Sequence, residues 1–173
     1  MQEVIEKAKK IKLMVFDVDG VLTNGQLFFT EDGTELKAFN SLDGHGIKML
    51  HQAGIDTAII TGRTSKLVIK RAKDLGITHL YQGREDKLQA LQELLAESAL
   101  SLEEVSYVGD DLPDLGAIRA VGLGIAVSNA HSFVRENADW QTTLSGGSGA
   151  AREICDLILD AQGQLTPLLE TYL

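Results

Sequence analysis

The stretch VFDVDGVLTNG, residues 15–25, places two carboxylates, Asp17 and Asp19, at the end of an apolar run. Like charges at the end of a buried strand repel each other and lose hydration, which costs free energy unless a cation or hydrogen-bond donors are present. An aspartate attacks phosphorus when the phosphoryl oxygens are neutralised, and a second carboxylate two residues on carries the proton. With a metal ion and phosphate-binding groups at the same place, the pair would carry out phosphoryl transfer, with Asp17 as nucleophile and Asp19 as general acid and base.

Three more polar clusters follow apolar runs of the chain. The segment TGR, residues 61–63, follows DTAII, the segment GDDLPD, residues 109–114, follows VSYV, and Lys87 begins a helical pattern after LYQG. The carboxyl ends of parallel strands meet at one edge of a sheet, so these clusters are expected to converge. Thr61, Lys87 and the N-terminus of a helix near Thr64 are expected to bind phosphoryl oxygens.

Several carboxylates at one edge predict a hard divalent cation. Magnesium prefers oxygen ligands and uses few protein carboxylates, which suits Asp17, Asp110 and a main-chain carbonyl of the opening loop. Asp111 and Asp114 are then expected to orient the ligands of the metal or Lys87. The four histidines are scattered and the chain has a single cysteine, Cys155, so the sequence does not indicate zinc.

These residues require a scaffold, and the apolar pattern predicts an α/β doubly wound (Rossmann-like), mainly parallel sheet. The expected strands are residues 11–17, 56–60, 78–81, 105–109, 122–127 and, weakly, 138–143. Helical patterns separate most of them and carry stop signals at Gly54 and Gly76. We expect a single domain over residues 1–173, with no separate cap domain.

An inserted β-hairpin is predicted after the first strand, at about residues 25–40, because Asp32-Gly33 joins two extended stretches. Phe28, Phe29, Leu36 and Phe39 give it more apolar surface than a free two-stranded arm should expose. We expect the hairpin to pack on another subunit. The alternative is that it folds back on its own domain.

Composition limits the partners. The formal charge of −9, from 16 basic and 25 acidic residues, argues against binding to nucleic acid or to an anionic membrane. No apolar run approaches the length of a membrane span, and the N-terminus lacks the apolar core of a signal peptide, so a cytoplasmic protein is expected. Cys155 has no internal partner for a disulfide and is expected to be a buried apolar filler.

Taken in order, DVDG, TGR, Lys87 and GDDLPD resemble the four motifs of the haloacid dehalogenase superfamily of phosphatases. The stretches GTELKAFN, DGHGIKML, LGITHLYQG and GGSGAAREICDLIL are similar to its capless subfamily, and the resemblance covers most of the chain. It implies a magnesium-dependent enzyme that hydrolyses 3-deoxy-D-manno-octulosonate 8-phosphate, whose product enters the lipopolysaccharide inner core. It also implies a homotetramer in which hairpins and C-terminal tails, here about residues 162–173, cover neighbouring active sites.

Residue by residue, the resemblance implies metal binding by Asp17, by Asp19 through its carbonyl, and by Asp110. The residues that it implies for substrate contacts are Asp19, Asn40, Ser41, Leu42, Asp43, Gly44, Lys48, Arg63, Arg71 and Lys87. Helical spacing alone does not decide whether the Arg71 side chain faces solvent or a ligand. Two departures are visible: Ser41 and Leu42 replace the commoner valine and arginine, and TNG replaces TDG.

The missing arginine keeps substrate identity open, because a guanidinium that pairs with a sugar carboxylate contributes about 1.5–3 kcal/mol. The near alternative is a phosphatase for a related nonulosonate 9-phosphate. A non-catalytic scaffold subunit is the alternative from another class. It is disfavoured because a scaffold has no need of Asp17, Thr61 and Lys87 at these places.

Overall fold

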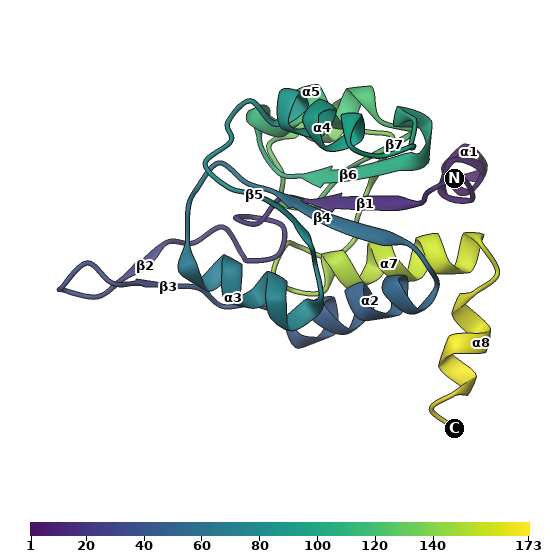
Figure 1. The fold of residues 1–173 in the computed structure, drawn as a ribbon, viewed down its shortest axis with the longest axis horizontal. Helices are drawn as coiled ribbons and strands as arrows, with labels where there is room; N and C mark the ends of the chain where they lie inside the picture. Colours follow the sequence, from purple (N-terminus) through teal and green to yellow (C-terminus); the bar gives the residue numbers. More distant parts are fainter.

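A six-stranded parallel sheet forms the centre of the molecule (Figure 1). The computed structural model describes all 173 residues. In spatial order the strands are β5 (His79–Tyr81), β4 (Asp56–Ile60), β1 (Leu13–Phe16), β6 (Val105–Gly109), β7 (Leu123–Ala126) and β8 (Trp140–Gln141). Every neighbouring pair is parallel. The chain builds the sheet outward from β1 on one side and then from β6 on the other, which confirms the predicted doubly wound fold.

The central strands are largely apolar because helices cover both faces of the sheet. Every residue of β1, β6 and β7 is buried, whereas the edge strands β5 and β8 are partly exposed. Buried, mainly apolar runs of this kind are the pattern of parallel strands with two covered faces. Figure 1 shows α2, α3 and α7 on one face and α4 and α5 on the other.

The helices fill the connections between the strands. They are α1 (Gln2–Ala8), α2 (Ser41–Gln52), α3 (Lys66–Leu75), α4 (Lys87–Ala96), α5 (Leu115–Ala120), α6 (Ser132–Glu136), α7 (Ala150–Ala161) and α8 (Leu165–Glu170). Short 3₁₀ helices span Leu102–Glu104 and Leu112–Asp114. Helix α7 packs along α2 and contains the buried Cys155, as expected. None of the helices is long and apolar enough to cross a membrane.

Two helices next to the site begin at side-chain caps. The Asn40 side chain accepts a hydrogen bond of 2.8 Å from the Leu42 amide, so α2 begins at Ser41, earlier than its apolar pattern indicates. Ser65 caps α3 in the same way through the Leu67 amide at 3.3 Å. That helix ends at Gly76, whose φ of 79° is the left-handed conformation of a helix stop.

The predicted hairpin is present, with shorter strands than the sequence pattern indicates. It pairs β2 (Phe28–Phe29) with antiparallel β3 (Glu35–Leu36). In Figure 1 it projects away from the body at the end of the sheet where β1 stops. Phe28, Phe29 and Leu36 are 45%, 58% and 54% exposed, as large apolar side chains on a free arm.

Phe39 departs from the expectation of an exposed hairpin side chain. It is half-buried against the main core, and the Arg71 guanidinium lies 5.6 Å from the centre of its ring. The second arm of the hairpin therefore returns to the body before α2 begins. Among the apolar side chains of the hairpin, only those at the tip are left without a surface to pack on within this chain.

The expected tail is partly helical. Helix α8 leaves the body at the end opposite the hairpin in Figure 1. The Tyr172 hydroxyl lies 3.1 Å from Nε2 of His45 on α2. Upstream of the helix, the Gln162 side chain donates hydrogen bonds to the carbonyls of Ala8 and Ile11, which ties the start of the tail to the N-terminal segment.

Candidate active site

A polar cavity of about 360 Å³ opens at the carboxyl ends of β1, β4 and β6. Eleven residues line it, and none of them is hydrophobic. They are Asp17, Asp19, Thr61, Gly62, Arg63, Glu85, Lys87, Asp110, Asp111, Pro113 and Asp114. The structure thus brings together the three motifs that the sequence placed at strand ends and Lys87 at a helix start, because the parallel topology directs these positions to one edge.

Asp17 and Lys87 form the buried centre of the cavity. The Lys87 ammonium lies 3.0 Å from Asp17 Oδ1 and 2.6 Å from Asp114 Oδ1, and its side chain is 5% exposed. Lys87 is the first residue of α4, so the helix start aims it at the end of β1. The contact with Asp17 is an ion pair without hydrogen-bond geometry, since Asp17 Oδ1 is buried with no hydrogen-bond partner.

Burial and mutual repulsion raise the pKa values of two carboxyl groups in the cavity. Burial, followed by the negative charge of Asp114, raises the pKa of Asp17 from 3.8 to about 8, although Lys87 opposes the shift. Burial and the same neighbour raise the pKa of Asp110 to about 7. Positive charge placed between these groups would restore their ionised forms.

Three carboxylates could hold that positive charge. One side-chain oxygen each from Asp17, Asp110 and Asp114 lie within 4.8 Å of one another. Oδ1 of Asp17 is buried with no hydrogen-bond partner, beside the Lys87 ammonium at 3.0 Å. An all-oxygen donor set fits a hard divalent cation such as magnesium.

Gly20 allows Asp110 to approach the loop that carries Asp17. A Cβ atom on Gly20 would lie 2.0 Å from Asp110 Oδ2, and the residue has a φ of 97°. Any side chain here would push the Asp110 carboxylate away and force a left-handed backbone. Glycine is therefore required at this position for the Asp110 carboxylate to approach the loop.

Asp114 accepts hydrogen bonds from several groups in and beside the cavity. Its Oδ1 accepts from the Tyr107 hydroxyl at 2.8 Å as well as from Lys87, and its Oδ2 accepts from the Asp110 and Asp111 amides. Asp111 is exposed and caps the short 3₁₀ helix through the Leu112 amide. Of the two residues expected to orient the site, Asp114 contacts Lys87 directly, and Asp111 shapes the loop.

We expect Asp114→Ala to lower the free energy of unfolding by about 2–4 kcal/mol, because a buried acceptor of four donors is lost. Urea denaturation without metal measures this. Asp111→Ala is the matched control and should cost about 1 kcal/mol, the value of a helix cap. Equal losses for the two variants would show that the buried hydrogen bonds of Asp114 contribute no more to the free energy of unfolding than the exposed cap of Asp111.

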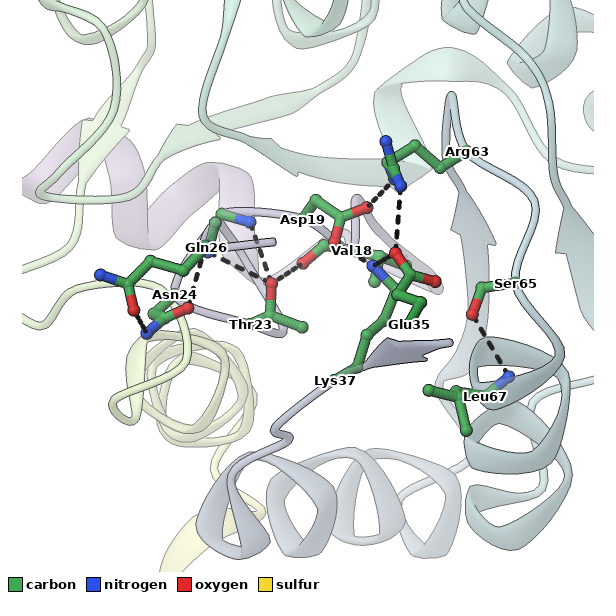
Figure 2. Close-up of polar contacts among 12 residues, drawn as sticks. Val18, Asp19, Thr23, Asn24, Gln26, Glu35, Lys37, Arg63, Ser65 and Leu67 are labelled. Atoms are coloured by element: carbon green, nitrogen blue, oxygen red, sulfur yellow. Dashed lines mark hydrogen bonds and ion pairs between the residues drawn. The ribbon is translucent and has the colours of Figure 1, made fainter. Parts of the chain in front are cut away.

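Asp19 lies at the mouth of the cavity and is contacted from two other segments (Figure 2). Lys37 of the hairpin donates a short charge-assisted hydrogen bond to Asp19 Oδ1, and Arg63 Nε lies 3.8 Å from Asp19 Oδ2. Glu35 lies 3.3 Å from the Lys37 ammonium and 3.1 Å from Arg63 Nη2. The four groups form a ring of alternating charge that links the loop after β1, the hairpin and the loop after β4.

The turn after Asp19 is held by its own side chains. The Thr23 hydroxyl donates to the Val18 carbonyl at 3.4 Å and accepts from the Gly20 amide at 3.3 Å (Figure 2). Asn24 Oδ1 accepts from the Gln26 amide at 3.0 Å. An aspartate can accept the same bond, so the change from TDG to TNG preserves this turn.

Sequence reasoning missed Lys37 and Glu35 as members of the site. A signal was present, because residues two apart on a strand share a face, and GTELKAFN places both charges on one face of the second hairpin arm. That pattern does not say which face turns toward Asp19. The structure supplies this information.

The other residues implied as substrate contacts lie outside the cavity in a single chain. Asn40 and Ser41 begin α2, Leu42 is 58% exposed, and Lys48 lies on the exposed side of the same helix. Gly44 is buried beside Arg71, whose Nη2 donates to the Asn40 carbonyl at 3.0 Å. Asp43 is buried and accepts from the Arg152 amide at 2.9 Å.

The structure therefore divides the predicted set. Asp19, Arg63 and Lys87 line the polar cavity, and the α2 segment with Arg71 forms a separate surface. The glycine-rich loop GGSG packs on the loop of Asp17: the Gly147 amide donates to the Val21 carbonyl at 2.9 Å. A Cβ on Gly146 would lie 1.7 Å from the Gly20 carbonyl oxygen, so the loop is a close packing partner.

The parallel sheet, with a buried aspartate, a lysine and further carboxylates at its switch point, has the form of a haloacid dehalogenase-like hydrolase. A family model of that description matches residues 78–154. The 3-deoxy-D-manno-octulosonate 8-phosphate phosphatase of Escherichia coli K12 is 51% identical over 163 residues, which cover 94% of this chain and 87% of the relative. The chain belongs to the 3-deoxy-D-manno-octulosonate 8-phosphate phosphatase family, as its motifs predicted.

Solved structures agree with this placement. The phosphatase of the same description from Moraxella catarrhalis, in complex with a magnesium ion, a phosphate ion and a KDO molecule, has a TM-score of 0.98 and 48% identity, covering 100% of this chain and 99% of that one. The Yersinia pestis phosphatase has a TM-score of 0.93 and 51% identity, covering 95% and 89%. A cobalt-bound form from Haemophilus influenzae has a TM-score of 0.89 and 41% identity, covering 92% and 94%.

Proposed function

We propose that this chain is a magnesium-dependent phosphatase that hydrolyses 3-deoxy-D-manno-octulosonate 8-phosphate to the free sugar acid and phosphate. The observation that carries the proposal is the placement of Asp17 beside Lys87 in a polar cavity at the switch point of the sheet. The relatives that bear this activity in their names match nearly the whole chain. The product would then serve lipopolysaccharide synthesis, as the resemblance implies.

The reaction assigned to these residues has two steps. In the first, a carboxylate oxygen of Asp17 bonds to phosphorus while the bond from phosphorus to the sugar oxygen breaks, and Asp19 gives that oxygen its proton. In the second, Asp19 takes a proton from water, whose oxygen attacks phosphorus and releases phosphate and Asp17. Lys87 and Thr61 bind the phosphoryl oxygens in both steps.

Magnesium fits the oxygen donors of the cavity. Asp17 and Asp110 would hold the ion through their carboxylates and Asp19 through its main-chain carbonyl, with Asp114 fixing the loop beside them. The bound ion supplies the positive charge that neutralises the phosphoryl oxygens and allows the carboxylates to ionise. Arg63, which lines the cavity, would contact the sugar acid.

We further propose a homotetramer, because the remaining predicted contacts lie away from the cavity of their own chain. Hairpins and C-terminal tails would then cover neighbouring active sites, and the segment 40–44, Lys48 and Arg71 would face a neighbour's substrate. The exposed apolar tip of the hairpin supports this assembly. A cytoplasmic location is proposed with it, since the one cysteine is buried and has no disulfide partner.

The hairpin assembly predicts that Phe29→Asp yields smaller particles with reduced activity on the sugar phosphate. Phe29 is 58% exposed within the chain, so the melting temperature of the separated subunit should change little. Light scattering measures the mass. Glu31→Gln at the polar turn of the hairpin is the control and should keep the wild-type assembly. A wild-type protein that is a fully active monomer would refute the tetramer.

A substrate panel tests the proposed activity. Purified protein with magnesium is assayed for phosphate release from the octulosonate 8-phosphate and from a nonulosonate 9-phosphate, and the two kcat/KM values are compared. We expect a clear preference for the 8-phosphate. Preference for the 9-phosphate would support the second candidate, which Leu42 in place of an arginine favours. Feeble turnover of both would reject the leading proposal.

A further inference from the structure

Lys37 is buried although it comes from an exposed arm. Its side chain is 2% exposed, whereas its neighbour Leu36 is 54% exposed. A lysine loses hydration when it is buried, so a buried ammonium needs partners that replace the lost water. Lys37 has two carboxylates for this purpose, Asp19 and Glu35.

The two oxygens of Asp19 have different surroundings. Oδ1 accepts the charge-assisted hydrogen bond from Lys37. Oδ2 is buried and has no hydrogen-bond donor, with Arg63 Nε at 3.8 Å as its nearest ion-pair partner. A carboxylate held by one oxygen in this way has a fixed rotamer, and here Oδ2 is packed toward Arg63.

Glu35 holds Lys37 in place from the opposite side. Burial alone would raise the pKa of Glu35, but hydrogen bonds from Arg63 and Ser65 and the charge of Lys37 hold that pKa below its usual range. Glu35 is therefore ionised at neutral pH and attracts both Lys37 and Arg63. If the lysine turned to solvent, Arg63 alone would have to compensate the two carboxylates.

We propose that Lys37 is a positioning residue, which acts by holding Asp19 through Oδ1 so that the Asp19 carboxyl group is oriented to carry the proton to the leaving oxygen. The inference rests on the proposed phosphatase mechanism. The proton moves from the Asp19 carboxyl group to the bridging oxygen as the bond from that oxygen to phosphorus breaks and the bond from phosphorus to Asp17 forms. The hairpin thereby contributes to catalysis in its own subunit, besides any role in assembly.

Leaving-group dependence separates this role from a structural one. The parameter kcat/KM reports the steps up to release of the alcohol or phenol, and a poor leaving group needs its proton more than a good one. A residue that only holds the hairpin in place would affect all leaving groups alike. A residue that positions the acid would affect poor leaving groups most.

The test compares wild type with Lys37→Met on phenyl phosphates whose leaving groups span a range of acidity, and on the sugar phosphate. For Lys37→Met we expect kcat/KM to fall about 10-fold to 100-fold on unsubstituted phenyl phosphate and the sugar phosphate, but no more than about 3-fold on p-nitrophenyl phosphate. Lys37→Arg should recover part of the loss. Lys73→Met, on the exposed side of α3, should match wild type on every substrate.

A double variant tests whether Lys37 acts through Asp19. Asp19→Asn combined with Lys37→Met should be no slower than Asp19→Asn alone. The effects of two substitutions do not add when both act on the same proton transfer. Thermal melting of each variant ensures that the compared proteins are folded.

Equal losses on all leaving groups, unchanged rates in Lys37→Met, or additive losses in the double variant would each overturn the assignment. Wild type that hydrolyses the phenyl phosphates but not the sugar phosphate would reject the proposed substrate and still leave Lys37 testable on the phenyl series. A chain that hydrolyses neither would overturn the mechanism and the role of Lys37 together.

Discussion

Asp17→Asn is expected to reduce phosphate release by a factor on the order of 10⁴ or more, because the amide cannot form the phosphoenzyme bond. The loss should appear in kcat, with substrate binding largely preserved, since the shape of the side chain is retained. Rapid quench with ³²P-labelled substrate should show labelled wild-type protein and no label on the variant. Steady turnover or labelling of Asp17→Asn would refute Asp17 as the nucleophile.

The same substitution should not harm the fold. The pKa of Asp17 is raised to about 8 by burial and by Asp114, so ionising this group in the metal-free protein costs free energy of folding. An uncharged amide avoids that cost at high pH. We expect Asp17→Asn without metal at about pH 9 to melt at or above the wild-type temperature. Asp160→Asn on the exposed end of α7 is the control and should leave both activity and melting unchanged.

Removal of magnesium should abolish activity and make stability depend strongly on pH. The folded-state pKa values of Asp17 and Asp110 are about 8 and about 7, above the ordinary value of 3.8. A carboxyl with a raised folded-state pKa stabilises the fold fully below its unfolded pKa, and this contribution is lost as pH rises through the folded pKa. The metal-free protein should therefore lose stability progressively between about pH 4 and about pH 8 from these two groups.

In the proposed site magnesium would bind the ionised carboxylates, so it should offset this loss. The rise in melting temperature on adding magnesium is expected to be larger at about pH 9 than at about pH 5.5, where protons compete for the same oxygens. Differential scanning fluorimetry after treatment with a chelator measures both states, with calcium and sodium salts as controls for ionic strength. A shift that is equal at the two pH values, or greater at the lower one, would contradict a magnesium site built on these carboxylates.

Much of the fold follows from local pattern. The strand DTAII is β4, and VSYVG is β6, because an apolar run with a polar group at its end is readable without neighbours. The start of α2 is less readable, since Asn40 caps the helix only when the chain from the hairpin arrives in an extended conformation. Phe39 was expected on the hairpin surface for a related reason: an apolar side chain does not say whether it packs on its own chain or on another.

The acidic and phosphoryl-binding residues of the candidate site were predictable from the sequence. DVDG, TGR, Lys87 and GDDLPD all stand where strands end or helices begin, and a parallel sheet brings such positions together whatever the details of its packing. Lys37 and Glu35 were not predictable, because a charged pair on a hairpin is normally a solvated face. Their burial against Asp19 depends on the angle at which the hairpin leaves the body.

By itself the sequence determined the order of the elements, the residue types at the strand ends, the family and the phosphoryl-transfer chemistry that these imply. Only the tertiary structure decided that Asp114 accepts from Lys87, that Lys37 holds Asp19, and that Arg71 and the start of α2 lie outside the cavity of their own chain. The physical reason is the distance along the sequence over which each signal acts. Periodicity and turn signals act over a few neighbouring residues, whereas these ion pairs join residues 27 and 18 positions apart, and their geometry is set by the packing of whole elements.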